Sequence, residues 1–235
     1  MTQLFFSDYD DLDFPGSRPL VIVGAGGFGR EVLMLVRQLN EMRQQWDVLG
    51  FYDDQRPADP ELLHDLPYLG TVADLNATTD TVYVAVAVGN SHHRADVVGR
   101  LTARHLHFAT LIHPSVALRG YQNVQVGPGS IVTQGCVFTC DIVIGRHVLL
   151  NLGCTIGHDA VLEDFCSLMP HANVGGEAHL EAAVYLGTNA TVINQVRVGA
   201  RTIVGAGAVA VRDLPAGVTA VGVPAQVIKQ HAQHR

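Results

Sequence analysis

The 235-residue sequence is poor in charged and aromatic residues and has no long apolar run. No stretch approaches the roughly 20 apolar residues of a membrane-spanning helix. Its N-terminus, MTQLFFSDYDDLDF, is acidic where a secretory signal would be basic. Only 15 Lys and Arg residues are spread along a chain of net charge −7, which argues against nucleic acid as a partner. We therefore expect a cytoplasmic protein that inserts into no membrane.

The four cysteines include no Cys-x-x-Cys pair, which argues against both a disulfide scaffold and a zinc ribbon. What the chain does have is 24 glycines and, beyond Leu111, a period of six residues. All fourteen positions of this register are apolar: Val126, Val132, Phe138, Ile144, Leu150, Ile156, Leu162, Leu168, Val174, Leu180, Leu186, Val192, Val198 and Val204. The residues four positions later are nearly all small, and glycine follows half of the fourteen.

Neither a helix, with a period near 3.6, nor an exposed strand, with a period of 2, explains this register. Short strands joined by turns do, if three hexads form one coil of 18 residues with the apolar and small residues inside. The pattern resembles the hexapeptide-repeat transferases, which implies a left-handed parallel β-helix, all-β in class. Cys136, Cys154 and Cys166 occupy small inward positions, so we expect them to be core residues.

The residues before the repeat predict a small open parallel α/β unit of Rossmann-like type. We expect strands at 19–23, 48–52 and 82–88 and a helix at 30–39. The predicted domains are an N-terminal arm (1–18), the Rossmann-like domain (19–110), the β-helix (111–228) and a C-terminal tail (229–235).

A glycine-rich turn, G-x-G-x-x-G at Gly24, Gly26 and Gly29, lies between the first strand and the helix, and Asp53 and Asp54 end the second strand. Backbone N–H groups at such a turn face an anion, and the carboxylates accept hydrogen bonds from sugar hydroxyls. The alternative is that the glycines serve only a tight turn. The domain is too short for a full dinucleotide fold, so a nucleotide-sugar fits better than a dinucleotide.

Adding or subtracting 18 places His158 in a column with Cys140, Gly176, Asn194 and Arg212. The neighbouring column contains Asp141, Asp159 and Glu177. Acids beside a histidine favour its imidazolium form, which suits a general base. The alternative is a solvated surface histidine.

A metal site is also conceivable, because γ-class carbonic anhydrases share the β-helix and bind zinc through histidines that include a pair four residues apart. The histidines of the repeat, His147, His158, His171 and His179, contain no such pair. We therefore expect no metal.

Seven motifs in fixed order are similar to the bacterial sugar O- and N-acyltransferases, which include sialic acid O-acetyltransferases and nucleotide-amino-sugar N-acetyltransferases. They are the glycine-rich turn, Phe51-Tyr52-Asp53-Asp54, Val88-Gly89-Asn90, Leu111-Ile112-His113-Pro114, Gly157-His158-Asp159, Gly176 and Gly222-Val223-Pro224-Ala225. The resemblance implies that the α/β unit holds the nucleotide of an activated sugar. It also implies that the β-helix forms a homotrimer with acetyl-CoA between neighbouring subunits.

The same resemblance implies roles for individual residues. His158 matches the base, Asp159 its acidic partner, and Gly176 a glycine whose amide faces the thioester carbonyl. The expected sugar- and nucleotide-binding residues are Gly24, Gly26, Asp53, Asp54, Gly89, Asn90 and Asn151. The expected coenzyme contacts are Ser167, Gly176, Thr188 and Ala206. The chain departs from its relatives at Ser167, where they carry a second histidine, and at Gln226, where they carry a basic residue.

These observations predict an acetyl-CoA-dependent acetyltransferase that acts directly on the amino group of a nucleotide-linked amino sugar. Acetylation of a sugar or sialic acid hydroxyl is the alternative within the class. An NAD-dependent oxidoreductase and a non-catalytic scaffold are the alternatives outside it.

Overall fold

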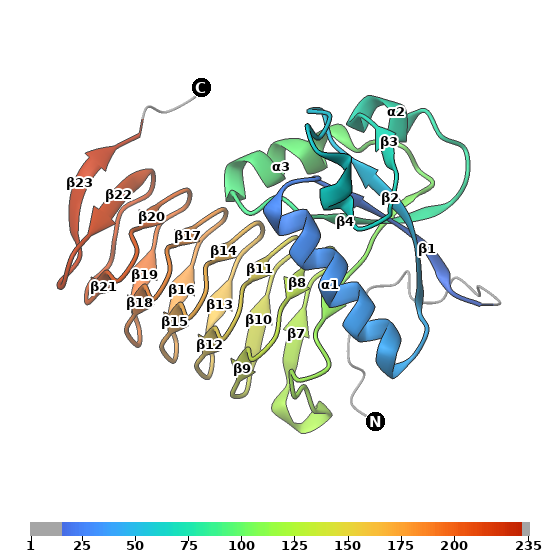
Figure 1. Cartoon of the computed structure of the whole chain (residues 1–235). Helices are drawn as coiled ribbons and strands as arrows, with labels where there is room; N and C mark the ends of the chain where they lie inside the picture. Colours follow the sequence, from blue (N-terminus) through green and yellow to red (C-terminus); the bar gives the residue numbers. More distant parts are fainter. Residues whose placement is uncertain (1–15, 232–235) are drawn as a thin grey trace.

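A computed structural model describes residues 16–231, so the predicted N-terminal arm lies almost wholly outside the described residues. The N-terminal α/β unit is a five-stranded parallel sheet in the order β3-β2-β1-β4-β5 (Figure 1). Its strands are β1 (Arg18–Val23), β2 (Trp46–Tyr52), β3 (Tyr68–Gly70), β4 (Val82–Val86) and β5 (Leu106–Phe108). Its helices are α1 (Gly27–Met42), α2 (Val72–Asn76) and α3 (Ser91–Arg100), with a 3-10 turn at Pro60–Leu63.

The central strand β1 is an uninterrupted apolar run because both faces of the sheet are covered. Leu20 and Ile22 pack with α1 on one face. Val21 and Val23 pack with residues of α2 and α3 on the other. The sequence predicted β1, α1, β2 and β4, but not the shorter β3, α2 and β5 or the helix α3.

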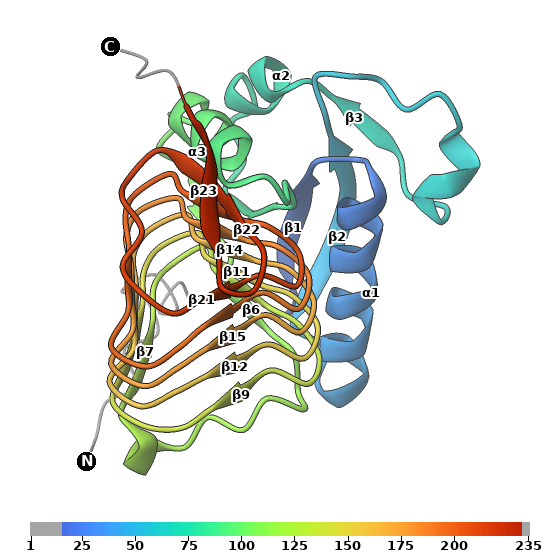
Figure 2. The same ribbon diagram turned by 90° about the vertical axis from the view of Figure 1, so that its left-hand side faces the viewer.

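The second half is a left-handed parallel β-helix, as the six-residue period predicts. Its strands are β6 (Leu111–Ile112), β7 (Val124–Val126), β8 (Ile131–Val132), β9 (Val137–Phe138), β10 (Ile142–Ile144), β11 (Leu149–Leu150), β12 (Thr155–Ile156), β13 (Val161–Leu162), β14 (Ser167–Leu168), β15 (Asn173–Val174), β16 (His179–Leu180), β17 (Tyr185–Leu186), β18 (Thr191–Val192), β19 (Arg197–Val198), β20 (Ile203–Val204) and β21 (Val209–Ala210). A 3-10 turn at Gly120–Gln122 follows the first coil. The coils are three-sided when seen along their stack (Figure 2).

Each coil repeats after 18 residues, so that Thr155 pairs with Asn173 and Leu149 with Ser167. The three faces are an eight-stranded sheet containing β8, β11, β14, β17 and β20, the β7 sheet (β7, β10, β13, β16, β19) and the β9 sheet (β9, β12, β15, β18, β21). All residues of the predicted apolar register except Val126 are buried. The small positions, with Cys136, Cys154 and Cys166, are buried as well.

Many corners between faces contain a non-glycine residue in the left-handed region, spaced six residues apart. Asp159 (φ 58°), Phe165 (φ 64°) and Glu177 (φ 59°) are examples. Such values are uncommon for L-residues and cost free energy at each position. The stacked strands and buried interior hold every one of these corners in place.

One face of the β-helix is covered by the α/β unit (Figures 1 and 2). Leu111, Ile131 and Leu149 point outward from the eight-stranded sheet and belong to the same apolar cluster as α1 and β1. The other two faces expose apolar side chains in the single chain, among them Val137 on the β9 sheet and Val143 on the β7 sheet.

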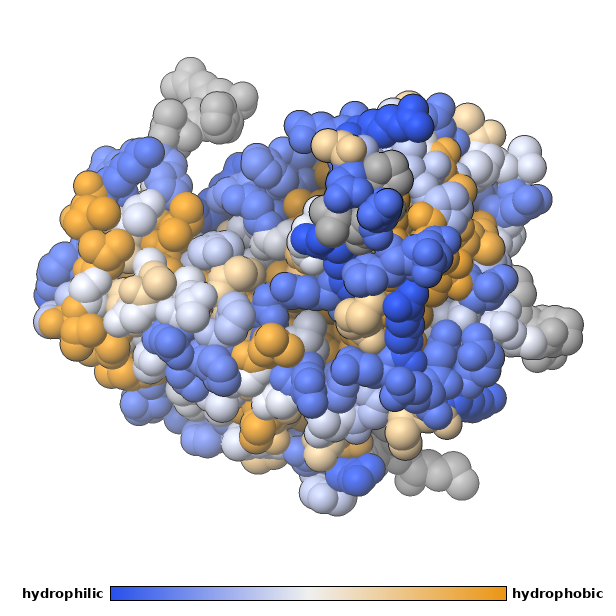
Figure 3. Space-filling view, in the orientation of Figure 1, coloured by the Kyte–Doolittle hydropathy of each residue, from blue (hydrophilic) through white to orange (hydrophobic). Residues whose placement is uncertain are grey.

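The C-terminal end of the β-helix closes with β22 (Val218–Val221) and β23 (Gln226–Gln230), which pair antiparallel. The predicted tail therefore begins inside a strand. Val223, Val227 and Ile228 are exposed there, and apolar side chains gather at this end of the molecule (Figure 3). None of the helices within residues 16–231 is long and apolar enough to cross a membrane.

Candidate active site

His158 and Asp159 lie at the corner where the chain passes from β12 to β13, that is, from the β9 sheet to the β7 sheet. The ring Nδ1 of His158 is 2.8 Å from Asp159 Oδ2. Both side chains are more than half exposed, at 56% and 58%. The pairing fixes the ring and leaves Nε2 directed away from the carboxylate, as a general base requires.

Gly176 occupies the equivalent corner one coil later. Glu177 N–H donates to the His158 carbonyl across 2.7 Å, so the predicted column exists. A Cβ at Gly176 would lie 2.5 Å from His158 Nε2. The ring therefore packs directly over this glycine, and only a residue without a side chain leaves Nε2 in place. No hydrogen bond of the described residues uses the Gly176 N–H.

The glycine-rich turn lies at the carboxyl ends of β1 and β4, next to the loop at Gly89. The strand order reverses between these strands, which is where open α/β sheets bind ligands. Gly24 has φ +109°, and a Cβ there would lie 2.7 Å from the Ala87 carbonyl oxygen, so the position requires glycine. Asp53 Oδ2 accepts a hydrogen bond from Ala25 N–H at 2.8 Å, which holds that carboxylate against the turn.

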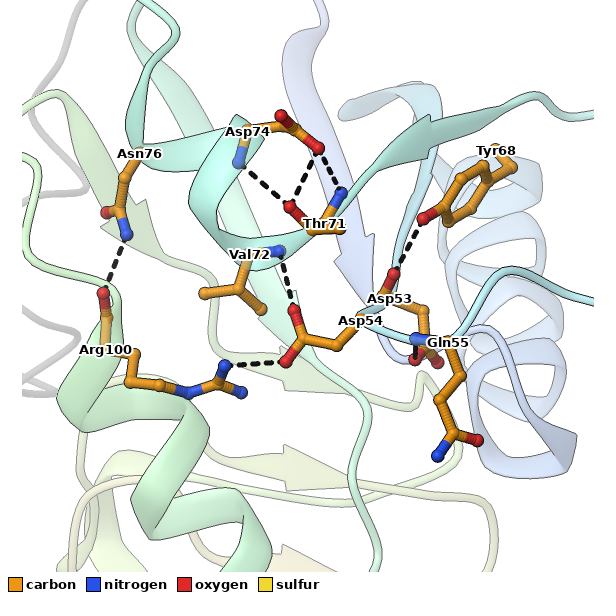
Figure 4. A network of polar contacts seen from close by, with 9 residues as sticks. All are labelled: Asp53, Asp54, Gln55, Tyr68, Thr71, Val72, Asp74, Asn76 and Arg100. Atoms are coloured by element: carbon orange, nitrogen blue, oxygen red, sulfur yellow. Dashed lines mark hydrogen bonds and ion pairs between the residues drawn. The ribbon is translucent and has the colours of Figure 1, made fainter.

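Asp54 faces the other way (Figure 4). Its carboxylate pairs with Arg100 at 2.6 Å and accepts from Val72 N–H at 3.1 Å. The hydrogen bond from Arg100 is the main reason that the pKa of Asp54 lies below its usual value. The two neighbouring acids therefore divide: Asp53 lies at the turn, whereas Asp54 ties the end of β2 to α2 and α3.

A pocket of about 300 Å³ lies between the α/β unit and the eight-stranded face of the β-helix. It is lined by Gly89, Asn90, Ser91 and His92 from one side and by Met169, Tyr185 and Ile203 from the other. The Asn90 side chain caps α3 by accepting from His92 and His93 N–H, both at 3.0 Å. Two predicted substrate-binding residues thus line this pocket.

The predicted coenzyme residues fall in two places. Thr188 and Ala206 are exposed and lie one coil apart at the corner between the eight-stranded sheet and the β9 sheet. Ser167 is fully buried, and its hydroxyl accepts a hydrogen bond from Arg94 at 2.8 Å. A covered hydroxyl offers a coenzyme no surface, so we leave Ser167 out of the coenzyme site.

Asn151 lies at the same corner region as Thr188, beside Leu152, whose N–H donates to Asn151 Oδ1 at 2.7 Å. The His158 corner is a different edge of the prism, remote in topology from the face that carries the pocket. One chain therefore does not bring the predicted base, the predicted sugar contact Asn151 and the nucleotide pocket together.

Sequence reasoning missed Arg94, an α3 residue that is only 2% exposed. It also missed His147, whose ring lies between Phe108 and Phe165, with its centroid 4.5 and 5.2 Å from theirs. Burial lowers the pKa of His147 to about 4, so the ring is neutral. Neither residue belongs to a recognisable motif. No group of three or more His, Cys, Asp or Glu suited to a metal ion occurs among residues 16–231.

The fold and this site define an acyltransferase of the hexapeptide-repeat type. Residues 19–101 match the PglD N-terminal domain family. PerB from Caulobacter crescentus, solved with CoA and GDP-perosamine, is 31% identical with a TM-score of 0.79, over 92% of this chain and 99% of that one. WeeI from Acinetobacter baumannii is 30% identical with a TM-score of 0.79, over 90% and 100%.

The acetyltransferase domain of PglB from Neisseria gonorrhoeae is 28% identical with a TM-score of 0.80, over 90% of this chain and 100% of that one. No curated protein sequence matches the chain. The chain belongs to the bacterial sugar acyltransferases of the hexapeptide-repeat type. The oxidoreductase and scaffold alternatives are therefore wrong.

Proposed function

We propose that the protein transfers an acetyl group from acetyl-CoA to the amino group of a nucleotide-linked amino sugar. The observation that carries the proposal is the contact of His158 Nε2 with Gly176 while Nδ1 holds Asp159. Support also comes from the relatives, since PerB was solved with CoA and GDP-perosamine and the PglB domain with acetyl coenzyme A. Perosamine N-acetyltransferase was also solved as histidine variants with both ligands, which accords with a histidine in the reaction.

In the proposed reaction the sugar nitrogen attacks the thioester carbonyl carbon while His158 Nε2 takes the proton of the amine. Asp159 orients the ring through Nδ1 and stabilises its charged form. The Gly176 N–H donates to the oxyanion of the tetrahedral intermediate. The C–S bond then breaks, and the proton returns from His158 to the departing thiolate of CoA. No covalent enzyme intermediate is needed.

We further propose that the working site forms between copies of the chain in a homotrimer. The nucleotide pocket lies on the covered face of the β-helix, whereas His158 lies at the opposite corner between the two uncovered faces. A second copy packed on an uncovered face would bring its own corner toward this pocket. Acetyl-CoA would then lie between His158 of one subunit and the Thr188 and Ala206 corner of another.

The test is a thiol-release assay with acetyl-CoA across UDP-, GDP- and CMP-linked amino sugars, with free sialic acid included for the O-acetylation alternative. We expect CoA release with a nucleotide amino sugar and a loss of about 10²–10⁴-fold in kcat for His158→Ala. The matched control is His171→Ala, because His171 is also an exposed corner histidine packed over a glycine, Gly153, but has no acidic neighbour in sequence.

At saturating acetyl-CoA the control variant should keep a normal kcat. Near-normal turnover by His158→Ala would remove His158 from the mechanism. CoA release with sialic acid but with no amino sugar would replace N-acetylation by O-acetylation.

A further inference from the structure

Arg94 is a buried guanidinium that joins the two halves of the chain. On the α/β side its Nη1 donates to the carbonyls of Val88 and Gly89, at 2.7 and 3.3 Å. On the β-helix side the partners are the His147 carbonyl for Nε, at 2.9 Å, and three oxygens for Nη2. The Nη2 partners are the carbonyls of Phe165 (2.9 Å) and Cys166 (3.0 Å) and the Ser167 hydroxyl (2.8 Å).

All of these partners are neutral oxygens, and none recorded among the described residues is a carboxylate. Burial lowers the pKa of Arg94 to about 10, so the group is still charged at neutral pH. A buried charge without a counter-ion is costly, and an apolar contact of the same size serves stability better. Retention of a cation here therefore points to a need for fixed geometry.

The geometry that Arg94 fixes is that of the pocket loop. Val88 and Gly89 run directly into Asn90, and Gly89 and Asn90 line the pocket between the two domains. The β-helix carbonyls of His147 and Phe165 belong to corner residues in the left-handed region and accept no ladder hydrogen bond. One planar group thus connects the loop on one wall of the pocket to the coils that carry the other wall.

We propose that Arg94 is a positioning residue that holds the Gly89–Asn90 loop against the β-helix and so sets the shape of the nucleotide-sugar pocket. It touches no substrate. This inference rests on the proposed function only for the identity of the ligand. Lysine cannot replace it, because a single ammonium cannot present donors in two directions across a flat fork.

The first test measures the loop itself and needs no substrate. Hydrogen exchange of the peptide spanning residues 86–93 is compared in the wild type, Arg94→Lys and Val98→Ala. Val98 packs in the α3 core on the far face of the sheet, so its truncation loosens α3 without touching the loop contacts. We expect faster exchange at 86–93 and at 165–167 in Arg94→Lys, but not in Val98→Ala at equal distance below the unfolding midpoint. Equal exchange in the two variants would overturn the proposal.

The second test is kinetic. Arg94→Lys and Arg94→Ala should raise the KM for the nucleotide-sugar about 10- to 100-fold, the range for lost hydrogen bonds to a charged group. The KM for acetyl-CoA and kcat should stay near normal. Millimolar guanidinium added to Arg94→Ala should restore part of the loss, and it should do nothing for Val98→Ala. A fall in kcat with unchanged KM values, or no effect in Arg94→Lys, would refute the positioning role.

The two proposals fail separately. If the wild-type protein turns over no nucleotide amino sugar, the proposed function is wrong, while the exchange measurement still decides the role of Arg94. If the wild type is active and both Arg94 variants keep normal KM values, the function stands and the positioning role is refuted.

Discussion

Replacing Gly176 by alanine tests the proposed geometry at its narrowest point. The new Cβ would lie 2.5 Å from His158 Nε2, 2.7 Å from Cε1 and 2.9 Å from Cδ2. The shortest of these falls about 0.9 Å below the ordinary contact limit of 3.4 Å. The ring is half exposed and must swing outward by about that amount, while the backbone N–H of residue 176 stays.

A displacement near 1 Å at a reacting group costs about 10²-fold in rate. We therefore expect kcat of Gly176→Ala to fall about 10²-fold, with the unfolding midpoint nearly unchanged because the clash is relieved into solvent. The assay is CoA thiol release under saturating substrates. In the His158→Ala background the same substitution should cost little more, since the two residues act through one contact. Turnover of Gly176→Ala within about threefold of wild type would refute the reasoning.

Three further predictions concern stability and reactivity. Gly24→Ala should lower the free energy of unfolding by about 1–3 kcal/mol and Gly26→Ala by less than about 1 kcal/mol in urea titrations, because only Gly24 combines positive φ with a close backbone contact; equal losses would contradict this. The Ala200 N–H and then Arg197 lower the pKa of Glu181 below its ordinary 4.5, so its stabilisation is present above pH 4.5 and lost as pH falls through the folded pKa. Glu181→Gln should thus lower the unfolding midpoint at pH 7 but not at strongly acidic pH, and a loss independent of pH would exclude the ion pair. A thiol reagent should titrate one cysteine in the native protein, the exposed Cys140, and four after unfolding; the reaction should be slow at pH 7 because a hydrogen bond with Asp141 raises the pKa of that thiol, and rapid modification of more than one thiol would contradict the buried positions.

The repeat was the part of the fold that the sequence predicted best. Its register depends on local chemistry that recurs every six residues, so each coil confirms the next, and the His158 and Gly176 column followed by counting alone. The short strands β3 and β5 carry too few residues to show a period, and tertiary packing decides them.

The residues that the sequence misjudged all depend on how the two halves meet. Ser167 is an outward position by register, yet the α/β unit covers that face and buries it beneath Arg94. Asp54 follows Asp53 in the same motif, but Arg100, 46 residues away, turns it toward α2 and α3. Arg94 itself gave no signal, because an arginine in an amphipathic helix is usually solvated. Contacts between distant segments leave no trace in local pattern.

Strict stacking at 18 residues limits how the length of this chain can change. Adding one hexad between His158 and Gly176 would rotate every later corner by a third of a turn and leave a different residue beneath the imidazole. Adding a whole coil would restore the corner but bring a new residue next to the ring. Length variation compatible with this site is therefore confined to the two ends of the stack, or to loops that bulge from a corner and rejoin it, as the extra residues near Gly120–Gln122 do.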